Sequence, residues 1–241
     1  MYRLAKITLV LLAACIAACI AGFVLISAWN ILFETVFVGV PALVLFSKLK
    51  KAEAGGGSVK AGDVVGAWII AGLTMFVTFT SAPIGIGSGS VWKYPFQRAY
   101  LGRFIKDDAA ELFPERLEDV QGDYELRFMP TIMQGGGFMS LCYRTSPERA
   151  AAVEDRYAPG AVHTIPLDEY GGSGSFYRVE GFEPNGSKDG TVTVGISGVM
   201  EREHSGGAVI YVLYSNYDWN HQRSRAVIVD KETGLVQYWE E

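Results

Sequence analysis

Polar and aromatic side chains gather in one segment near the C-terminal end, Asn216-Tyr217-Asp218-Trp219-Asn220-His221-Gln222. Its first, third and fifth residues have the spacing that opens a calcium loop. A histidine stands at the sixth position, where glycine is needed, and Val227 at the twelfth, where a glutamate is needed. An EF-hand is therefore excluded, and an irregular calcium site is the remaining calcium option. Because aromatic rings can stack on a sugar or a peptide, we predict a binding site at Asn216, Tyr217, Asp218, Trp219 and His221.

Catalytic nucleophiles are weakly indicated. Cys142 is the one cysteine after residue 91, and it falls in a predicted strand, so a buried thiol is favoured over a nucleophile. The motif G-x-S-x-G is missing, since both Gly171-Gly172-Ser173-Gly174-Ser175 and Gly195-Ile196-Ser197-Gly198 break it. Both segments are predicted to be turns or strand bends. The sequence thus favours a non-enzymatic protein without excluding an enzyme.

Metal ligation has little support in the sequence. The three histidines, His163, His204 and His221, are far apart, with no H-E-x-x-H and no C-x-x-C. The run Glu201-x-Glu203-His204 is predicted to be the charged end of a hairpin, with a ligand set as the alternative. We predict no metal and no cofactor.

The aromatic content of the last strands allows two interpretations. Six rings follow one another near the C-terminal end: Tyr211, Tyr214, Tyr217, Trp219, Tyr238 and Trp239. Aromatic residues on a sheet usually form core and cross-strand pairs. The alternative is an exposed row that binds a component of the cell envelope.

Residues 92–241 carry the elements that must position these groups. Their patterns predict a helix over 96–113, strands over 124–129 and 138–144, a helix over about 146–157, and strands over 175–182, 191–199, 208–217, 225–230 and 235–239. Ser146 and Pro147 have the cap and first-position chemistry of the second helix. The fold class expected is a small α+β domain with a mostly antiparallel sheet.

Charge divides the chain at about residue 91. Residues 1–91 contain six basic and three acidic side chains, whereas residues 92–241 contain fifteen basic and twenty-three acidic ones. An acidic domain is a poor nucleic-acid binder, so nucleic acid is excluded as a partner. The division indicates an apolar membrane part followed by a domain in water.

Three apolar stretches predict a helical membrane anchor with spans at about 7–27, 31–47 and 64–86, within a transmembrane region of residues 1–91. A cleaved lipoprotein signal ending at Cys15 is the alternative for the first span. It is disfavoured because the residues after Cys15 stay apolar. Glu34 is expected at the interface near Trp29 rather than in an ion pathway, and Gly85-x-Gly87-x-Gly89 in a membrane exit rather than a phosphate loop.

Small residues repeat every four positions in the first and third spans, for example Ala13, Ala17 and Ala21, and then Ala67 and Ala71. Such faces let helices approach closely in lipid. Packing within one chain is the plain interpretation, and homo-oligomerisation through these faces is the alternative. Basic residues near the N-terminus and in the loop 48–63 predict that both are cytoplasmic and that the domain 92–241 is extracytoplasmic.

The segment Pro130-Thr131-Ile132-Met133-Gln134-Gly135-Gly136 and the preceding Phe113-Pro114-Glu115-Arg116-Leu117 resemble parts of uncharacterised membrane-anchored proteins of Gram-positive bacteria. The resemblance covers about 30 residues and implies a helical anchor with a small envelope-facing domain. It implies no activity and no site.

The sequence therefore predicts a multi-pass protein of the cell membrane that displays an extracytoplasmic binding or interaction domain. Its partners would be the lipid bilayer and other membrane or envelope components. The alternative is a membrane-anchored envelope hydrolase with an unrecognised site. A transport function of the spans is a third hypothesis, which requires polar groups inside the helix bundle.

Overall fold

The computed structural model describes residues 1–80, 89–105, 110–130, 137–171, 177–178, 191–218 and 221–241. The chain forms two compact units, which we call the helical unit (Met1–Ile84) and the sheet domain (Gly85–Glu241). Predictions at 81–88, 131–136 and 179–190 lie outside the described residues.

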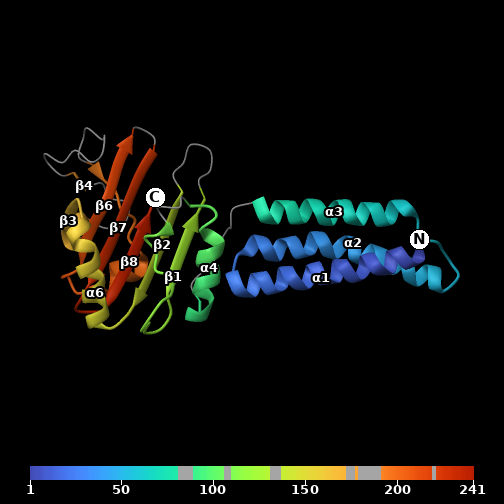
Figure 1. Ribbon diagram of the computed structural model, residues 1–241, viewed down its shortest axis with the longest axis horizontal. Coiled ribbons are helices and arrows are strands. Elements are labelled where there is room, and N and C mark those ends of the chain that lie inside the picture. The colour runs from blue at the N-terminus through green and yellow to red at the C-terminus, as the bar shows by residue number, and fades with distance from the viewer. Residues whose placement is uncertain (81–88, 106–109, 131–136, 172–176, 179–190, 219–220) are drawn as a thin grey trace. The chain divides into compact units, whose positions relative to one another are not determined.

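The helical unit consists of α1 (Tyr2–Ile26), α2 (Trp29–Glu53) and α3 (Ala61–Thr80), which run alongside one another (Figure 1). The chain reverses between α1 and α2 at Ser27, whose backbone is left-handed with φ 61°. Two segments, Tyr2–Ile26 and Ile31–Glu53, are long and apolar enough to cross a membrane, and the apolar stretch Ala61–Thr74 is shorter. The helices pack through small and medium side chains, among them Ala5, Leu12, Ala42, Leu45, Ala67 and Ala71.

The sheet domain is built on one antiparallel sheet of six strands in the order β1-β2-β8-β7-β6-β3 (Figure 1). The strands are β1 (Glu125–Met129), β2 (Phe138–Arg144), β3 (His163–Pro166), β6 (Val209–Asp218), β7 (His221–Asp230) and β8 (Leu235–Glu240). A two-stranded piece pairs β4 (Tyr177–Arg178) with β5 (Thr191–Val192). The α+β prediction with a mostly antiparallel sheet is confirmed.

Helices and two 3₁₀ turns flank the sheet. They are η1 (Val91–Lys93), α4 (Tyr94–Leu101), α6 (Pro147–Tyr157) with its continuation η2 (Ala158–Gly160), α7 (Leu167–Tyr170) and α8 (Gly198–Glu203). The Ser146 hydroxyl accepts a hydrogen bond from the Arg149 N–H at 3.3 Å, so the predicted cap of α6 is present. The helix predicted over 96–113 is wrong in length, because α4 ends at Leu101. Gly102 follows there, and glycine is a poor helix former.

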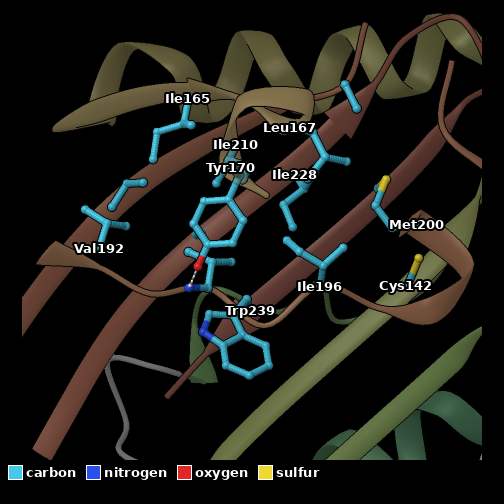
Figure 2. Close-up of a cluster of buried hydrophobic side chains, with 14 of the residues drawn as sticks. Cys142, Ile165, Leu167, Tyr170, Val192, Ile196, Met200, Ile210, Ile228 and Trp239 are labelled. Carbon is cyan, nitrogen blue, oxygen red and sulfur yellow. Dashed lines mark hydrogen bonds between the residues drawn. The ribbon is translucent and has the colours of Figure 1, made fainter. Parts of the chain in front are cut away.

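Both faces of the sheet are covered, because neighbouring residues of a strand point to opposite sides. Tyr238 packs against Phe113 and against Tyr157 of α6. Its neighbour Trp239 belongs to the other core, which also contains Ile165, Leu167, Tyr170, Val192, Val194, Ile196, Met200, Ile210 and Ile228 (Figure 2). The segment after β5 therefore lies on the face opposite α6.

The strand predicted over 191–199 is wrong beyond Val192. Val194 and Ile196 are buried and residue 195 between them is partly exposed, as alternation predicts, but residues 193–197 form no ladder. Gly195 lies flat on the Trp239 ring, where an added Cβ would come within 2.2 Å of the ring carbons. At this position glycine is required by the close packing.

Candidate functional site

The residues predicted to bind a ligand lie at the end of the β6–β7 hairpin. Asn216 is half-buried and pairs in register with Arg223, while Tyr217 pairs with Gln222 and Asp218 with His221. The hairpin thus places four of the five predicted residues, Asn216, Tyr217, Asp218 and His221, in three consecutive backbone pairs. Trp219 lies outside the described residues. Binding at this hairpin end stays a prediction.

A buried polar network that the sequence did not indicate lies between the sheet and the 195–199 segment. The Ser197 hydroxyl donates to Glu125 of β1, and the Ser197 backbone N–H donates to Gln237 Oε1 of β8 at 2.9 Å. The Gln237 amide donates in turn to Ser140 Oγ at 3.0 Å and to the Gly195 carbonyl oxygen at 2.8 Å. In the sequence, Gln237 stands between the apolar residues Val236 and Tyr238 of a predicted strand. This position is the signal that could have indicated a buried polar side chain.

The geometry of Ser197 disfavours a nucleophilic role. Its side chain also accepts the Val199 N–H at 3.2 Å and caps α8, and the residue is only 2% exposed. The Glu125 carboxylate that accepts its hydrogen bond is itself paired with Arg127. A nucleophile must contact a substrate and pass its proton to a base. The Ser197 hydroxyl is instead buried, and its hydrogen bonds are made to Glu125 and to the Val199 N–H. The network holds the 195–199 segment against the sheet.

Cys142 is buried, as predicted, and is 1% exposed in the centre of β2. Burial raises the pKa of the Cys142 thiol to about 12, although its hydrogen bond to Ser197 opposes that shift. The reactive form of cysteine is the thiolate, which is scarce at neutral pH under these conditions. The nucleophile interpretation of Cys142 therefore has no support.

The acidic and histidine residues around α8 do not converge. Glu203 pairs with Arg144 at 2.8 Å, while His204 Nδ1 accepts the Gly206 N–H at 3.0 Å and its Nε2 lies 3.8 Å from Asp168 Oδ1. Within the described ranges, no three His, Cys, Asp or Glu side chains form a group that could hold a metal ion. The predicted hairpin end at Glu201–His204 is wrong, because these residues form α8 and its C-cap.

Three aromatic residues of the last strands belong to the core. Tyr211, Tyr238 and Trp239 are buried. The Tyr211 hydroxyl donates to Glu154 of α6 at 2.6 Å, and the Trp239 indole N–H donates to Ser224 at 2.9 Å. An exposed aromatic row that includes these three residues is therefore contradicted, and packing accounts for them.

The outer surface of the helical unit carries many large apolar side chains. Large exposed hydrophobic side chains occur on all three helices, including Leu4, Ile7, Val10, Leu11, Ile20 and Val24 on α1, Phe33, Val36, Phe37, Val40, Leu43, Val44 and Phe46 on α2, and Val65, Trp68, Ile69, Ile70, Leu73, Phe76 and Val77 on α3. Such a surface marks an interaction with a membrane or with another protein.

Charged groups of the helical unit gather where the helices begin or end. Lys6 near the start of α1 pairs with Glu53 at the end of α2, at 3.2 Å. Lys48 of α2 pairs with Asp63 near the start of α3. Glu34 departs from this pattern: it stands near the start of α2, as an interfacial residue would, but it is only 6% exposed.

Comparisons of the chain with protein-family models, with curated proteins and with solved structures find no match. The resemblance to membrane-anchored proteins of Gram-positive bacteria stays a prediction, and function must be argued from the residues.

Proposed function

We propose that the protein is an integral membrane protein whose three helices cross the bilayer and display the sheet domain in water as a binding or interaction module. The observation that carries the proposal is the apolar exterior of the helical unit. Only 11% of the most apolar stretch of α1 is buried, whereas the core helix of a water-soluble protein would be mostly buried. Exposing such a surface to water is unfavourable in free energy, whereas contact with the apolar tails of lipids is not.

The lengths of the helices support the proposal. The helices α1, α2 and α3 have 25, 25 and 20 residues. At about 1.5 Å per residue these lengths reach or exceed the ~30 Å of hydrocarbon in a bilayer. The ion pairs Lys6–Glu53 and Lys48–Asp63 form at the ends of the helices, where they would meet headgroups and water.

The orientation proposed has the N-terminus and the 48–63 loop in the cytoplasm and the sheet domain outside. Six basic residues, Arg3, Lys6, Lys48, Lys50, Lys51 and Lys60, flank the helices on the proposed cytoplasmic side. Basic residues are enriched in cytoplasmic loops. Three crossings then place the start of the sheet domain on the opposite side from the N-terminus.

A binding role is favoured over the alternative of an envelope hydrolase by the burial of the nucleophile candidates. Ser197 and Cys142 are sealed in the core. The half-buried Asn216 and its hairpin end remain the first place to look for a ligand.

Two measurements on the full chain test the proposal. Alkaline carbonate should leave the protein in the membrane pellet, because spanning helices resist it. Protease added to intact cells should cleave the sheet domain, and protease added to inverted vesicles should leave it intact. Release by carbonate would contradict membrane anchoring, and the reverse protease pattern would contradict the orientation.

A further inference from the structure

The first two elements of the sheet domain, η1 and α4, carry an exposed apolar stripe, which we call the α4 stripe. Trp92, Pro95, Phe96 and Ala99 recur at spacings of three and four residues and are all exposed, with Trp92 at 54% and Phe96 at 49%. The two large rings contact each other edge to face, with centroids 6.4 Å apart. Arg103 continues the stripe with a cation one turn further.

The opposite side of α4 is fixed to the core, so the stripe cannot turn inward. Tyr94 and Gln97 are fully buried. The Tyr94 hydroxyl donates to the Pro114 carbonyl oxygen at 2.8 Å, and Gln97 Oε1 accepts the Tyr124 hydroxyl at 2.5 Å. Arg98 is committed to the domain through the Phe113 and Ala110 carbonyl oxygens at 3.1 Å. A rigid domain therefore presents the stripe.

The charge of this segment is opposite to that of the rest of its domain. Residues 92–106 contain four basic and no acidic side chains, whereas residues 107–241 contain eleven basic and twenty-three acidic ones. The first carboxylates after the stripe are Asp107 and Asp108. A basic, aromatic segment suits an anionic lipid surface, which the remainder of the domain would avoid.

We propose that the α4 stripe inserts into the headgroup region of the same bilayer that holds the helices, with Trp92 and Phe96 at the level of the headgroups and Arg103 against lipid phosphates. This inference rests on the proposed membrane anchoring. Ten residues lie between Thr80, the end of α3, and Val91, and the eleven steps from one Cα to the next reach at most ~40 Å at about 3.5 Å each. The chain thus keeps the stripe near the membrane, where tryptophan and basic residues are favoured.

Docking through α4 determines which part of the sheet domain is free for a partner. Phe104, which follows α4, packs near Phe128 of β1, with ring centroids 6.3 Å apart. In the strand order, β1 is one edge of the sheet and β3 is the other. The β3 edge, preceded by the exposed Val162, then points away from the lipid.

Spin labels on the full-length chain in vesicles of phosphatidylcholine and phosphatidylglycerol test this inference. Ala99→Cys places a label on the stripe, and Val162→Cys places a matched label at the far edge. Cys15 and Cys19 are replaced by alanine, and Cys142 is buried and stays unlabelled. The label at Ala99 should collide more with oxygen than with a water-soluble nickel chelate, and the label at Val162 should show the reverse preference.

The electrostatic part of docking is tested with Arg103→Gln and the control Arg223→Gln, since both arginines are exposed. Loss of one surface cation near anionic lipid should lower the ratio of docked to undocked domain about fivefold. The control variant Arg223→Gln should leave this ratio unchanged. Wild-type protein in vesicles without phosphatidylglycerol should show a lower ratio of docked to undocked domain.

Trp92 gives a second measurement that needs no label. The fluorescence of Trp92 is the difference between the emission of the wild-type protein and that of Trp92→Phe. Lipids brominated close to the headgroup should quench this fluorescence, and iodide in the aqueous phase should not.

The outcomes separate the two proposals. Release of the chain by carbonate would overturn both. A carbonate-resistant protein whose Ala99 label prefers the nickel chelate would overturn docking and leave anchoring intact. A label at Ala99 that neither reagent reaches would also overturn docking, because it would indicate a covering protein surface instead of lipid.

Discussion

The two units of this protein distribute their apolar side chains in opposite ways. Among the described residues, twenty-two large hydrophobic side chains of the helical unit are exposed, against four in the sheet domain. The interior of the helical unit contains alanines such as Ala5, Ala67 and Ala71, whereas that of the sheet domain contains large rings such as Tyr238 and Trp239. The sheet domain is stabilised by removing apolar surface from water, whereas the helical unit leaves much of its apolar surface exposed and packs several alanines in its interior.

The largest effect is expected when a core ring of the sheet domain is removed. Trp239→Ala should lower the free energy of unfolding of this domain by about 3–5 kcal/mol, because it leaves a cavity and an unpaired Ser224 hydroxyl. Denaturant titration of the full chain in detergent micelles, followed by near-ultraviolet circular dichroism, measures it. Trp68→Ala, a tryptophan exposed on α3, is the matched control and should leave this transition in place.

A charge introduced on the exterior of the helical unit tests whether its exposed apolar surface meets lipid while that of the sheet domain meets water. Leu73 is exposed in the middle of α3, and Leu73→Asp should oppose its insertion into lipid by about 3 kcal/mol. Failure of α3 to insert would leave the sheet domain on the cytoplasmic side, which protease accessibility detects. Val162→Asp, at an exposed position of the sheet domain, should change the stability of that domain by no more than about 0.5 kcal/mol. Equal tolerance of both substitutions would show that water covers the helices.

Small residues test how the helices pack. Ala67 is buried in the bundle and Ala17 is exposed on α1. Ala67→Leu should overpack the bundle and lower its stability by about 1–3 kcal/mol, whereas Ala17→Leu should have little effect on it. Thermal loss of helical circular dichroism in micelles provides the measurement. Dissociation of a cross-linked dimer by Ala17→Leu would instead support homo-oligomerisation through the Ala13, Ala17 and Ala21 face.

The smallest expected effect depends on pH. Burial raises the pKa of the Glu241 carboxyl to about 7 from an ordinary value of 4.5. Between these pH values the folded state binds more protons than the unfolded state, so stability falls as pH rises through this window. Because the carboxyl is partly solvated, Glu241→Gln should stabilise the sheet domain by only about 1 kcal/mol at pH 8 and by much less at pH 4. The same gain at both pH values would exclude the carboxyl as the cause.

Periodicity in the sequence located strands better than it located their ends. The strands predicted over 138–144 and 208–217 correspond to β2 and β6, whereas in the segment 191–199 only β5 is a strand, although Val194 and Ile196 beyond it are buried. Alternation reports which side chains face a core, but it does not show whether backbone groups find a neighbouring strand. Residues 193–197 lie over a sheet face, and two of their backbone groups, the Ser197 N–H and the Gly195 carbonyl oxygen, bind the Gln237 side chain instead.

The polar network could not be predicted because its members are far apart in the sequence. Glu125 and Ser197 are 72 positions apart, and Gln237 and Ser140 are 97 apart. Each of these residues has an ordinary local context, and only the strand order places them together. The helical unit needed less of this information, since the length and composition of its apolar segments already predicted its helices. That lipid surrounds them stays a prediction.

Because Cys142 is a free and buried thiol, its reaction with a reagent can report local opening of the sheet domain. A water-soluble thiol reagent can reach this sulfur only when the sheet separates from the segment that covers it. In intact vesicles, the labelling rate would therefore measure how often the sheet domain opens, without truncation of the chain. A bound partner that stabilises the closed state would slow the labelling, so one thiol offers an assay for ligands of unknown identity.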